Sequence, residues 1–199
     1  MQWRVFNRVF TLNFRWTFLE APVLGIRSNL DEKSVENNGL HALLLDYDDI
    51  LSDKELIKEL YKFQKRFRLG DCEVFKSSWK KIYRFILNKN FPFLHIKIST
   101  IKKRHVYFFE DMMTYWQAIK IIFLSSCDPA FKRWRMIRNN IVLRISPKSD
   151  GCIPEPEFIV KSPYSKPEIR WFKDYVYGML RGEEVIKNRS FSAERIWNG

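Results

Sequence analysis

A short apolar run that ends in two alternate carboxylates constrains this chain more than any other feature. Residues 42–45 suit a buried β-strand, and Asp46 and Asp48 follow them directly. Alternate residues of a strand share a face, so both carboxylates are expected to point the same way. Like charges held side by side repel, and a cation between them relieves the repulsion. The pattern therefore predicts either a site for Mg²⁺ or Mn²⁺, which prefer carboxylate oxygens, or acidic residues that favour the start of a helix.

The balance of charge points to a polyanionic partner. Lys and Arg total 35 against 23 Asp and Glu, which gives a net charge of +12. Such an excess favours nucleic acid, the commonest polyanion, although charge alone also fits a basic protein without such a partner. The chain has 199 residues, of which 46% are hydrophobic. We therefore expect a folded domain with a sizeable core.

The cysteines and the N-terminal residues predict a cytoplasmic protein. The three cysteines are an odd number and form no Cys-x-x-Cys pair, which favours a reducing, intracellular compartment over a disulfide framework or a Cys-rich zinc site. Arg4, Arg8 and Arg15 interrupt any apolar run long enough for a signal peptide, so we expect no membrane partner. The alternation of apolar and polar residues over 10–18 predicts a half-buried strand.

Periodicity and turn signals predict a mixture of helices and strands. The expected elements are a strand ending at Asp46, a helix at 52–70, an ambiguous segment at 72–84, strands at 94–98 and 106–109, a helix at 110–127, a strand at 141–146 and a helix at 165–182. In the second helix, Met112, Trp116, Ile119 and Phe123 are expected to form the buried face.

This order predicts an α+β (α/β) fold with a split βαβ core like that of RNA-recognition-motif domains. Additional N-terminal strands and a C-terminal helix extend the core. We expect a single domain over residues 1–182, with its core at about 40–148, and a polar C-terminal tail at 183–199.

Three further features fall near the expected strand ends. Thr100 and His105 flank a predicted basic turn at 101–104, Asp128 follows the second helix, and Arg144 lies in an otherwise apolar strand. A buried arginine needs a carboxylate or a phosphate for its donors. Each feature also has a structural explanation. The histidine could have a structural role beside the turn, the aspartate before proline could be an ordinary turn residue, and the arginine could pair with an acidic residue of the core. Together with Asp46 they make up an inventory for nucleotidyl transfer.

The ordered motifs resemble the archaeo-eukaryotic primase superfamily, which includes the primase-polymerases. Its first motif, a strand ending in Asp-x-Asp, is similar to residues 44–48. Its second, a histidine at a strand start after small and basic residues, resembles 99–107 around His105. Its third, an acid and a downstream Leu-Arg-hydrophobic strand, resembles Asp128 and residues 143–146, with Lys148 as a basic follower. The resemblance covers residues 40–148. Lys103 departs from it, because the family prefers a small residue there, and the zinc-binding stem of many relatives is absent.

The resemblance implies metal-dependent nucleotidyl transfer, namely primer synthesis or template-dependent DNA or RNA polymerisation. It implies a two-metal site of Mg²⁺ or Mn²⁺ held by Asp46, Asp48 and Asp128, with His105 as a further catalytic residue. The residues that it implies for binding the nucleoside triphosphate are His105, Arg144, Lys148 and Thr100. A DNA or RNA template is the implied partner. The chain has no Walker A loop, so unwinding would come from a separate helicase or replication protein.

Two other functions stay open at this point. The same scaffold without catalysis would be a nucleic-acid-binding module, because residues 132–138 mix cations with an aromatic residue that can stack on a base. This run could equally be a solvated basic face. The expected nucleic-acid-binding residues are Lys102, Lys103, Lys132, Arg133, Trp134 and Arg135. A phosphatase of the haloacid-dehalogenase type also uses Asp-x-Asp after a strand, but Ser99 and residues 110–111 lie too close together to supply its remaining motifs.

Overall fold

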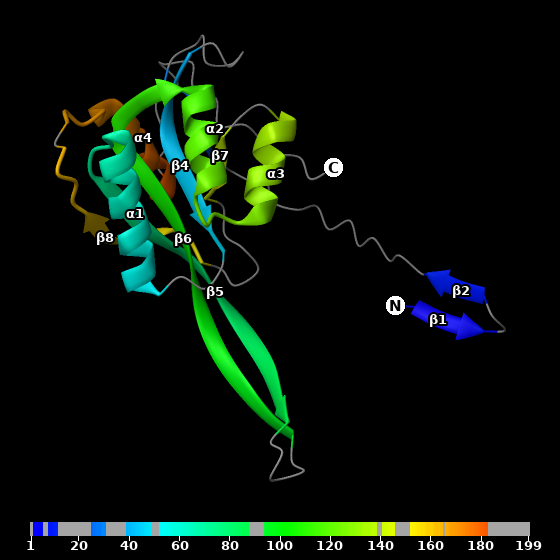
Figure 1. The fold of residues 1–199 in the computed structure, drawn as a ribbon. Coiled ribbons are helices and arrows are strands. Elements are labelled where there is room, and N and C mark those ends of the chain that lie inside the picture. The colour runs from blue at the N-terminus through cyan, green and yellow to red at the C-terminus, as the bar shows by residue number, and fades with distance from the viewer. Residues whose placement is uncertain are drawn as a thin grey trace.

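The computed structural model describes residues 2–5, 8–11, 25–30, 39–48, 52–87, 94–138, 141–145, 152–164 and 166–182. Its strands are β1 (Gln2–Val5), β2 (Arg8–Thr11), β3 (Gly25–Arg27), β4 (Leu40–Tyr47), β5 (Cys72–Leu87), β6 (Leu94–Thr114), β7 (Val142–Arg144) and β8 (Glu155–Val160). Its helices are α1 (Asp53–Phe67), α2 (Tyr115–Leu124), α3 (Pro129–Arg138) and α4 (Arg170–Leu180) (Figure 1). The fold is therefore α+β, as the sequence predicts.

A four-stranded antiparallel sheet with the order β4-β6-β5-β8 organises the molecule. β6 runs antiparallel to both β4 and β5, so β4 and β5 are parallel, with β6 between them and α1 connecting them. This is a split βαβ unit. The predicted final strand of the core, at 141–146, does not join this sheet. Its described part, β7, pairs with β3 instead, and β8 occupies the edge beside β5.

The outer edge of β4 is already hydrogen-bonded, which explains the position of β7. Ala42 N donates to Ser28 O at 2.8 Å, and Leu30 N donates to Leu40 O at 2.9 Å. Further along, Asp128 N donates to Asp46 O at 2.9 Å. Backbone groups beside a sheet need such partners. The segment before β4 and the loop after α2 supply them here, and β7 lies one strand further out.

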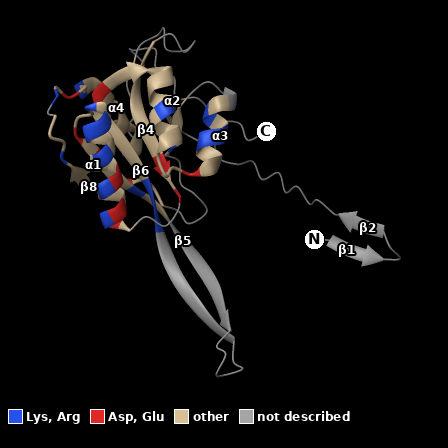
Figure 2. Ribbon diagram, in the orientation of Figure 1, with Lys and Arg blue, Asp and Glu red and all other residues tan. Residues whose placement is uncertain are grey.

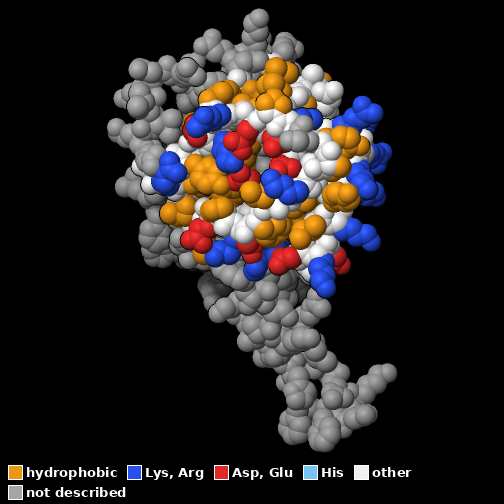
Figure 3. Space-filling view, turned by 90° about the vertical axis from the view of Figure 1, so that its left-hand side faces the viewer, with side chains coloured by type: hydrophobic (Ala, Val, Ile, Leu, Met, Phe, Trp, Pro, Cys, Tyr) orange, Lys and Arg blue, Asp and Glu red, His pale blue; other side chains and the backbone are white. Residues whose placement is uncertain are grey.

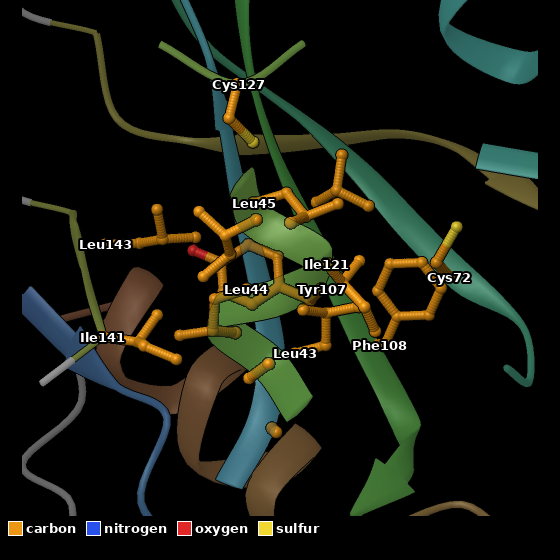
Figure 4. Close-up of a cluster of buried hydrophobic side chains, with 14 of the residues drawn as sticks. Leu43, Leu44, Leu45, Cys72, Tyr107, Phe108, Ile121, Cys127, Ile141 and Leu143 are labelled. Atoms are coloured by element: carbon orange, nitrogen blue, oxygen red, sulfur yellow. The ribbon is translucent and has the colours of Figure 1, made fainter. Parts of the chain in front are cut away.

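Helices cover both faces of the sheet, with α1 and α2 on one face and α4 on the other (Figure 1). Tyr47 of β4 donates to Glu59 of α1 at 3.0 Å. On the opposite face, Phe109 of β6 packs against Phe172 of α4 with ring centroids 6.0 Å apart. The core includes the apolar residues of β4, and Figure 4 shows Leu43, Leu44 and Leu45 among side chains from β6, α2 and the β7 segment.

The first helix follows its predicted signals closely. Ser52 and Glu55 form the predicted capping box, and Leu56, Leu60 and Phe63 are buried on one face. The helix ends earlier than predicted, at Arg68, which takes the left-handed conformation with φ 53°. Gly70 is not the cap of this helix. Its place beside Glu110 leaves no room for a side chain.

The region predicted as two strands around a basic turn is one continuous strand, β6. Residues 101–104 lie inside it and pair with β5, while Arg104 also faces Tyr47 of β4. The predicted turn is therefore wrong. Three consecutive cations resemble a solvent-exposed turn, but carboxylates from other elements pair with all three, at Asp48, Asp53 and Glu157. The ambiguous segment at 72–84 is likewise strand, as part of β5.

The second helix begins later and buries another face than predicted. β6 continues to Thr114, which opens α2 through a capping box with Gln117. Met112, Trp116 and Phe123 are exposed by 60%, 65% and 42%. The residues buried instead are Tyr115, Ala118, Ile119, Ile121 and Ile122. Gln117 and Lys120 are the only polar residues in this helix, so its pattern leaves the buried face open and tertiary packing decides it.

Other expectations lie partly outside the described residues. Of the predicted strand at 10–18, residues 10–11 are described, within the β1–β2 pair. The last helix is confirmed with Phe172 and Val176 buried, and Gly182 follows it at φ 70°. Ser165 and the predicted polar tail at 183–199 lie outside the described residues.

Candidate functional site

The β4–β6 pairing brings the two main predicted motifs together. Asp46 and His105 are direct cross-strand partners, which puts their side chains on the same face of the sheet. His105 Nε2 lies 3.6 Å from Asp46 Oδ1, a distance that suits an ion pair with a protonated imidazole but exceeds a good hydrogen bond. The His105 side chain is 1% exposed and that of Asp46 is 21% exposed. The carboxylate is thus partly exposed, with its Oδ1 buried, and the imidazole beside it is buried.

Asp48 lies just beyond β4, and Lys103 of β6 pairs with it. The Lys103 ammonium forms an ion pair with Asp48 Oδ2, and their side chains are 18% and 25% exposed. Since alternate positions share a face, Lys103 and His105 belong to the same side of β6. The positive charge of Lys103, a residue of the chain itself, therefore compensates the negative charge of Asp48 and reduces the predicted repulsion between the carboxylates. This lysine is the residue that departs from the primase pattern.

An aromatic layer supports these polar groups from the same face. Tyr107 is fully buried two positions after His105, with the two rings 6.4 Å apart. Burial and the negative charge of Asp46 raise the pKa of Tyr107 far above its ordinary value, so its hydroxyl stays protonated. Phe75 of β5 packs edge-on against Tyr107 at 4.9 Å. The sequence analysis assigned no role to either residue. Tyr107 alternates with His105 along β6, and this spacing could have identified it, whereas Phe75 lies opposite His105 on another strand.

Asp128 lies near this site through its backbone, but its side chain has a structural task. Its N–H donates to Asp46 O, while its Oδ2 accepts from Phe131 N at 2.8 Å. It therefore caps the first turn of α3, with Pro129 in the first helical position. Within the described part of the chain, no group of three or more His, Cys, Asp or Glu side chains is arranged to hold a metal ion. The predicted role of Asp128 as third metal ligand stays a prediction.

The other residues predicted on β6 are separated from the carboxylates or paired elsewhere. Thr100 lies five residues before His105 on a continuous strand, roughly 16 Å along it, and its side chain is outside the described part. Lys102 forms a short ion pair with Glu157 of β8. Burial raises the pKa of Glu157, but Lys102 and Arg104 together bring it below its usual value.

Arg144 is exposed on β7, opposite Gly25 in the register. The expectation that it is buried in its strand is therefore wrong. An exposed guanidinium has access to water, so burial no longer requires a carboxylate or phosphate beside it. Lys148 lies outside the described residues. The nucleotide-binding roles of both residues stay predictions.

The basic run predicted for nucleic-acid binding forms α3 (Figure 2). Arg133 and Trp134 are exposed on its surface. Lys132 reaches back to Ser125 O at 2.5 Å, and the guanidinium of Arg135 lies over the Phe131 ring at 4.7 Å. Arg133 and Trp134 are therefore exposed, while Lys132 and Arg135 are held against neighbouring residues.

No helix among the described residues is long and apolar enough to cross a membrane. The thiols of Cys72 and Cys127 are buried and outside any disulfide. Burial raises the pKa of Cys127 to about 12, so this thiol is not a nucleophile at neutral pH.

The candidate site is thus a pair of partly exposed carboxylates on one face of the sheet. Asp46 lies beside the buried His105, and Asp48 forms an ion pair with Lys103. Comparison of the chain with protein-family models, with curated proteins and with solved structures finds no match.

Proposed function

We propose that this protein catalyses metal-dependent nucleotidyl transfer on a nucleic acid, in primer synthesis or template-dependent polymerisation. One observation carries the proposal: the register opposes Asp46 to His105 on adjacent strands, with Asp48 two positions further along the same face. Two partly exposed carboxylates fit Mg²⁺ or Mn²⁺, because Mg²⁺ in nucleotide enzymes is often held by one or two carboxylates together with substrate phosphates. A third protein carboxylate is not required for this kind of site.

The residues of the site take distinct roles in this proposal. Asp46 and Asp48 would hold the divalent ions, which lower the pKa of the attacking hydroxyl and neutralise the departing pyrophosphate. His105 is buried beside Asp46 and orients this carboxylate rather than contacting the substrate. Lys103 holds Asp48 in the free protein. If Asp48 held a cation instead, the Lys103 ammonium would be available to a triphosphate on the same face.

The first prediction tests this site with charge-neutral, nearly isosteric changes. Asp46→Asn and Asp48→Asn should each abolish Mg²⁺- or Mn²⁺-dependent nucleotide incorporation on a primed or unprimed template. Thermal stability in metal-free buffer should hold or rise for Asp46→Asn, because the change relieves carboxylate repulsion. Incorporation of labelled nucleotides and thermal unfolding measure the two effects.

Asp128→Asn is the matched control for this experiment. Asparagine caps a helix as well as aspartate does, so α3 should stay intact while the same charge is removed a short distance from Asp46. Retained incorporation in Asp128→Asn with loss in the other two variants supports the two-carboxylate site. Equal activity in all the variants and the wild type would disprove it.

A second candidate function is a nucleic-acid-binding module without catalysis. The observation that favours it is the Lys103–Asp48 ion pair, which already compensates one carboxylate without a metal. Exposed Arg133 and Trp134 on α3 would then contact phosphate and base. Titration with a labelled nucleoside triphosphate and Mn²⁺ separates the two functions. Nucleic-acid binding without nucleotide binding at millimolar concentration selects the module.

A further inference from the structure

The hairpin of β5 and β6 extends far beyond the four-stranded sheet. β8 accompanies β5 only as far as Lys76, and β4 accompanies β6 only to Arg104. From the pair Ser78–Lys103 to the pair Leu87–Leu94, the two strands have no other strand partner among the described residues. We call this two-stranded part, residues 78–87 and 94–103, the ribbon. At about 3.3 Å per residue it is roughly 30 Å long, and Figure 1 shows it projecting away from the helices.

The part of the hairpin from Val74 to Phe109 contains no acidic residue. None of the chain's 23 Asp and Glu residues lies between Val74 and Phe109, whereas nine of its 35 Lys and Arg residues do. These nine are Lys76, Lys80, Lys81, Arg84, Lys89, Lys97, Lys102, Lys103 and Arg104. The ribbon and its connection therefore carry a strong, single-signed charge.

The four cations at the base of the hairpin differ from the rest. Carboxylates of other elements pair with Lys76, Lys102, Lys103 and Arg104, and thereby neutralise the part of the hairpin that belongs to the sheet. Further out, the register pairs Arg84 with Lys97, two cations opposite each other. Within residues 74–109 the sequence offers no acidic residue beside these two positions.

We propose that the ribbon binds double-stranded DNA by lying along its major groove. The major groove of B-form DNA is about 12 Å wide and admits a two-stranded β-ribbon. Lys80 lies four residues from Arg84, so these positions and Lys97 share one face of the ribbon. Cations on such a face neutralise phosphates along the groove. The deep, narrow major groove of A-form RNA excludes the same ribbon, which makes DNA the specific partner.

This partner is separate from the catalytic proposal and also deepens it. If the carboxylate site transfers nucleotides, the duplex held by the ribbon is the template with its growing strand, and in that respect the inference rests on the proposed function. The binding itself does not, because it depends on the ribbon and its charge alone. The two can therefore fail independently.

The experiment compares two triple variants of the full chain with the same reduction in charge. Lys80→Ala, Arg84→Ala and Lys97→Ala together alter the ribbon. Lys54→Ala, Lys58→Ala and Lys62→Ala together alter exposed positions of α1, four residues apart. Fluorescence anisotropy with a labelled 20-base-pair DNA duplex, repeated over a series of salt concentrations, measures affinity and salt dependence, and circular dichroism checks folding.

We expect the ribbon variant to lower the slope of log K against log[salt] by about 0.9 for each phosphate that the protein no longer neutralises, so by up to about 2.7. The α1 variant should stay close to the wild type. An equal decrease in the two triple variants would overturn the proposal, because net charge alone would then explain binding. Equally tight binding of a duplex RNA of the same length would overturn it as well.

A shortened hairpin provides a second, independent variant. Joining Lys81 to its register partner Thr100 through Asn-Gly, which favours the two-residue turns of hairpins, removes most of the ribbon and leaves the sheet. It should bind duplex DNA as weakly as the ribbon triple variant, and wild-type affinity would contradict the proposal. Asp46→Asn should bind DNA like the wild type. If the ribbon variants bind DNA normally while Asp46→Asn loses incorporation, the ribbon proposal fails. If the ribbon variants lose DNA binding while Asp46→Asn keeps incorporation, the proposed function fails.

Discussion

Lys103 compensates part of the negative charge of the carboxylate pair in the absence of substrate. A cation from the neighbouring strand compensates Asp48, while Asp46 faces the buried His105. The fold therefore tolerates two nearby carboxylates without a metal. However, Lys103 then occupies part of the Asp48 carboxylate, which a metal would use as a ligand. The same lysine explains how the site can be stable and still be open to cations.

Lys103→Gln should strengthen Mn²⁺ binding. A partly exposed ion pair contributes up to about 1 kcal/mol, so removing the competitor should lower the dissociation constant by up to roughly fivefold. Isothermal titration with Mn²⁺ measures it, and Lys102→Gln, which breaks the pair with Glu157 instead, is the control. Unchanged or weaker Mn²⁺ binding would show that Lys103 does not compete with a metal.

Gly70 illustrates a residue held by close packing. A Cβ atom at this position would lie 2.7 Å from the Cβ of Glu110, closer than van der Waals contact allows. Glu110 cannot simply move away, because its Oε2 accepts from Asp71 N at 2.9 Å and from Lys166 N at 3.2 Å. Gly70 N itself donates to Asp111 at 2.8 Å.

Gly70→Ala should therefore destabilise the protein by about 1–3 kcal/mol, the usual cost of overpacking. Urea unfolding measures the change. The double variant with Glu110→Ala should be destabilised by less than the sum of the two single variants, because the contacts with the Glu110 carboxylate disappear and only the contact with its Cβ stays. Additive effects would mean that the glycine is required for another reason.

At the scale of the elements, the transition from β6 to α2 rests on one capping box. Gln117 N donates to Thr114 Oγ1 at 3.3 Å, and Thr114 N donates to Gln117 Oε1 at 2.9 Å. These bonds end a 21-residue strand and start a helix without an intervening loop. The elements on either side position His105 and the loop that contacts Asp46.

Thr114→Ala should lower the free energy of unfolding by about 1 kcal/mol, the typical contribution of an N-cap side chain. Thr114→Ser should restore most of it, since the hydroxyl is kept. Chemical denaturation of the three proteins tests this. Equal stability of the alanine variant and the wild type would show that the cap is dispensable.

At the scale of the whole molecule, charged pairs join parts of the chain that are distant in sequence. Figure 3 shows acidic and basic side chains intermixed over the face that carries β8 and α4. Asp71, after α1, accepts from Ser162 N at 2.8 Å and from Lys161 Nζ at 2.6 Å. Burial raises the pKa of Asp71, but these partners bring it below its ordinary value, and the pKa of Glu157 shows the same net direction.

The protein should therefore become less stable in acid. A carboxyl whose pKa is lower in the folded state stabilises the fold above its unfolded pKa, and this stabilisation disappears as the pH falls through the folded pKa. The ordinary values are 4.5 for Glu157 and 3.8 for Asp71, so the decline should begin below about pH 4.5. Urea unfolding of the wild type and of a Glu157→Gln, Asp71→Asn double variant tests this. The double variant should be less stable at neutral pH and less sensitive to acid, and identical pH profiles would contradict the assignment.

The sequence by itself determined the local features of this protein. An apolar run ending in alternate carboxylates, and a capping box before an amphipathic stretch, specify β4 and α1 because their signals lie within a few residues. The same run predicted that Asp46 and Asp48 share one face, and their role in a site stays a prediction. The register places His105 opposite Asp46, although the turn expected before His105 is strand.

Only the tertiary structure decided what depends on distant partners. Lys102, Lys103 and Arg104 lie within a strand because carboxylates more than 50 residues away in sequence compensate them. The buried face of α2 depends on what packs against a helix that is apolar almost all round. β7 lies outside the main sheet because Ser28, Leu30 and Asp128 already bond to the edge of β4. Such pairings follow from the three-dimensional arrangement of the chain, and no pattern within one segment can show them.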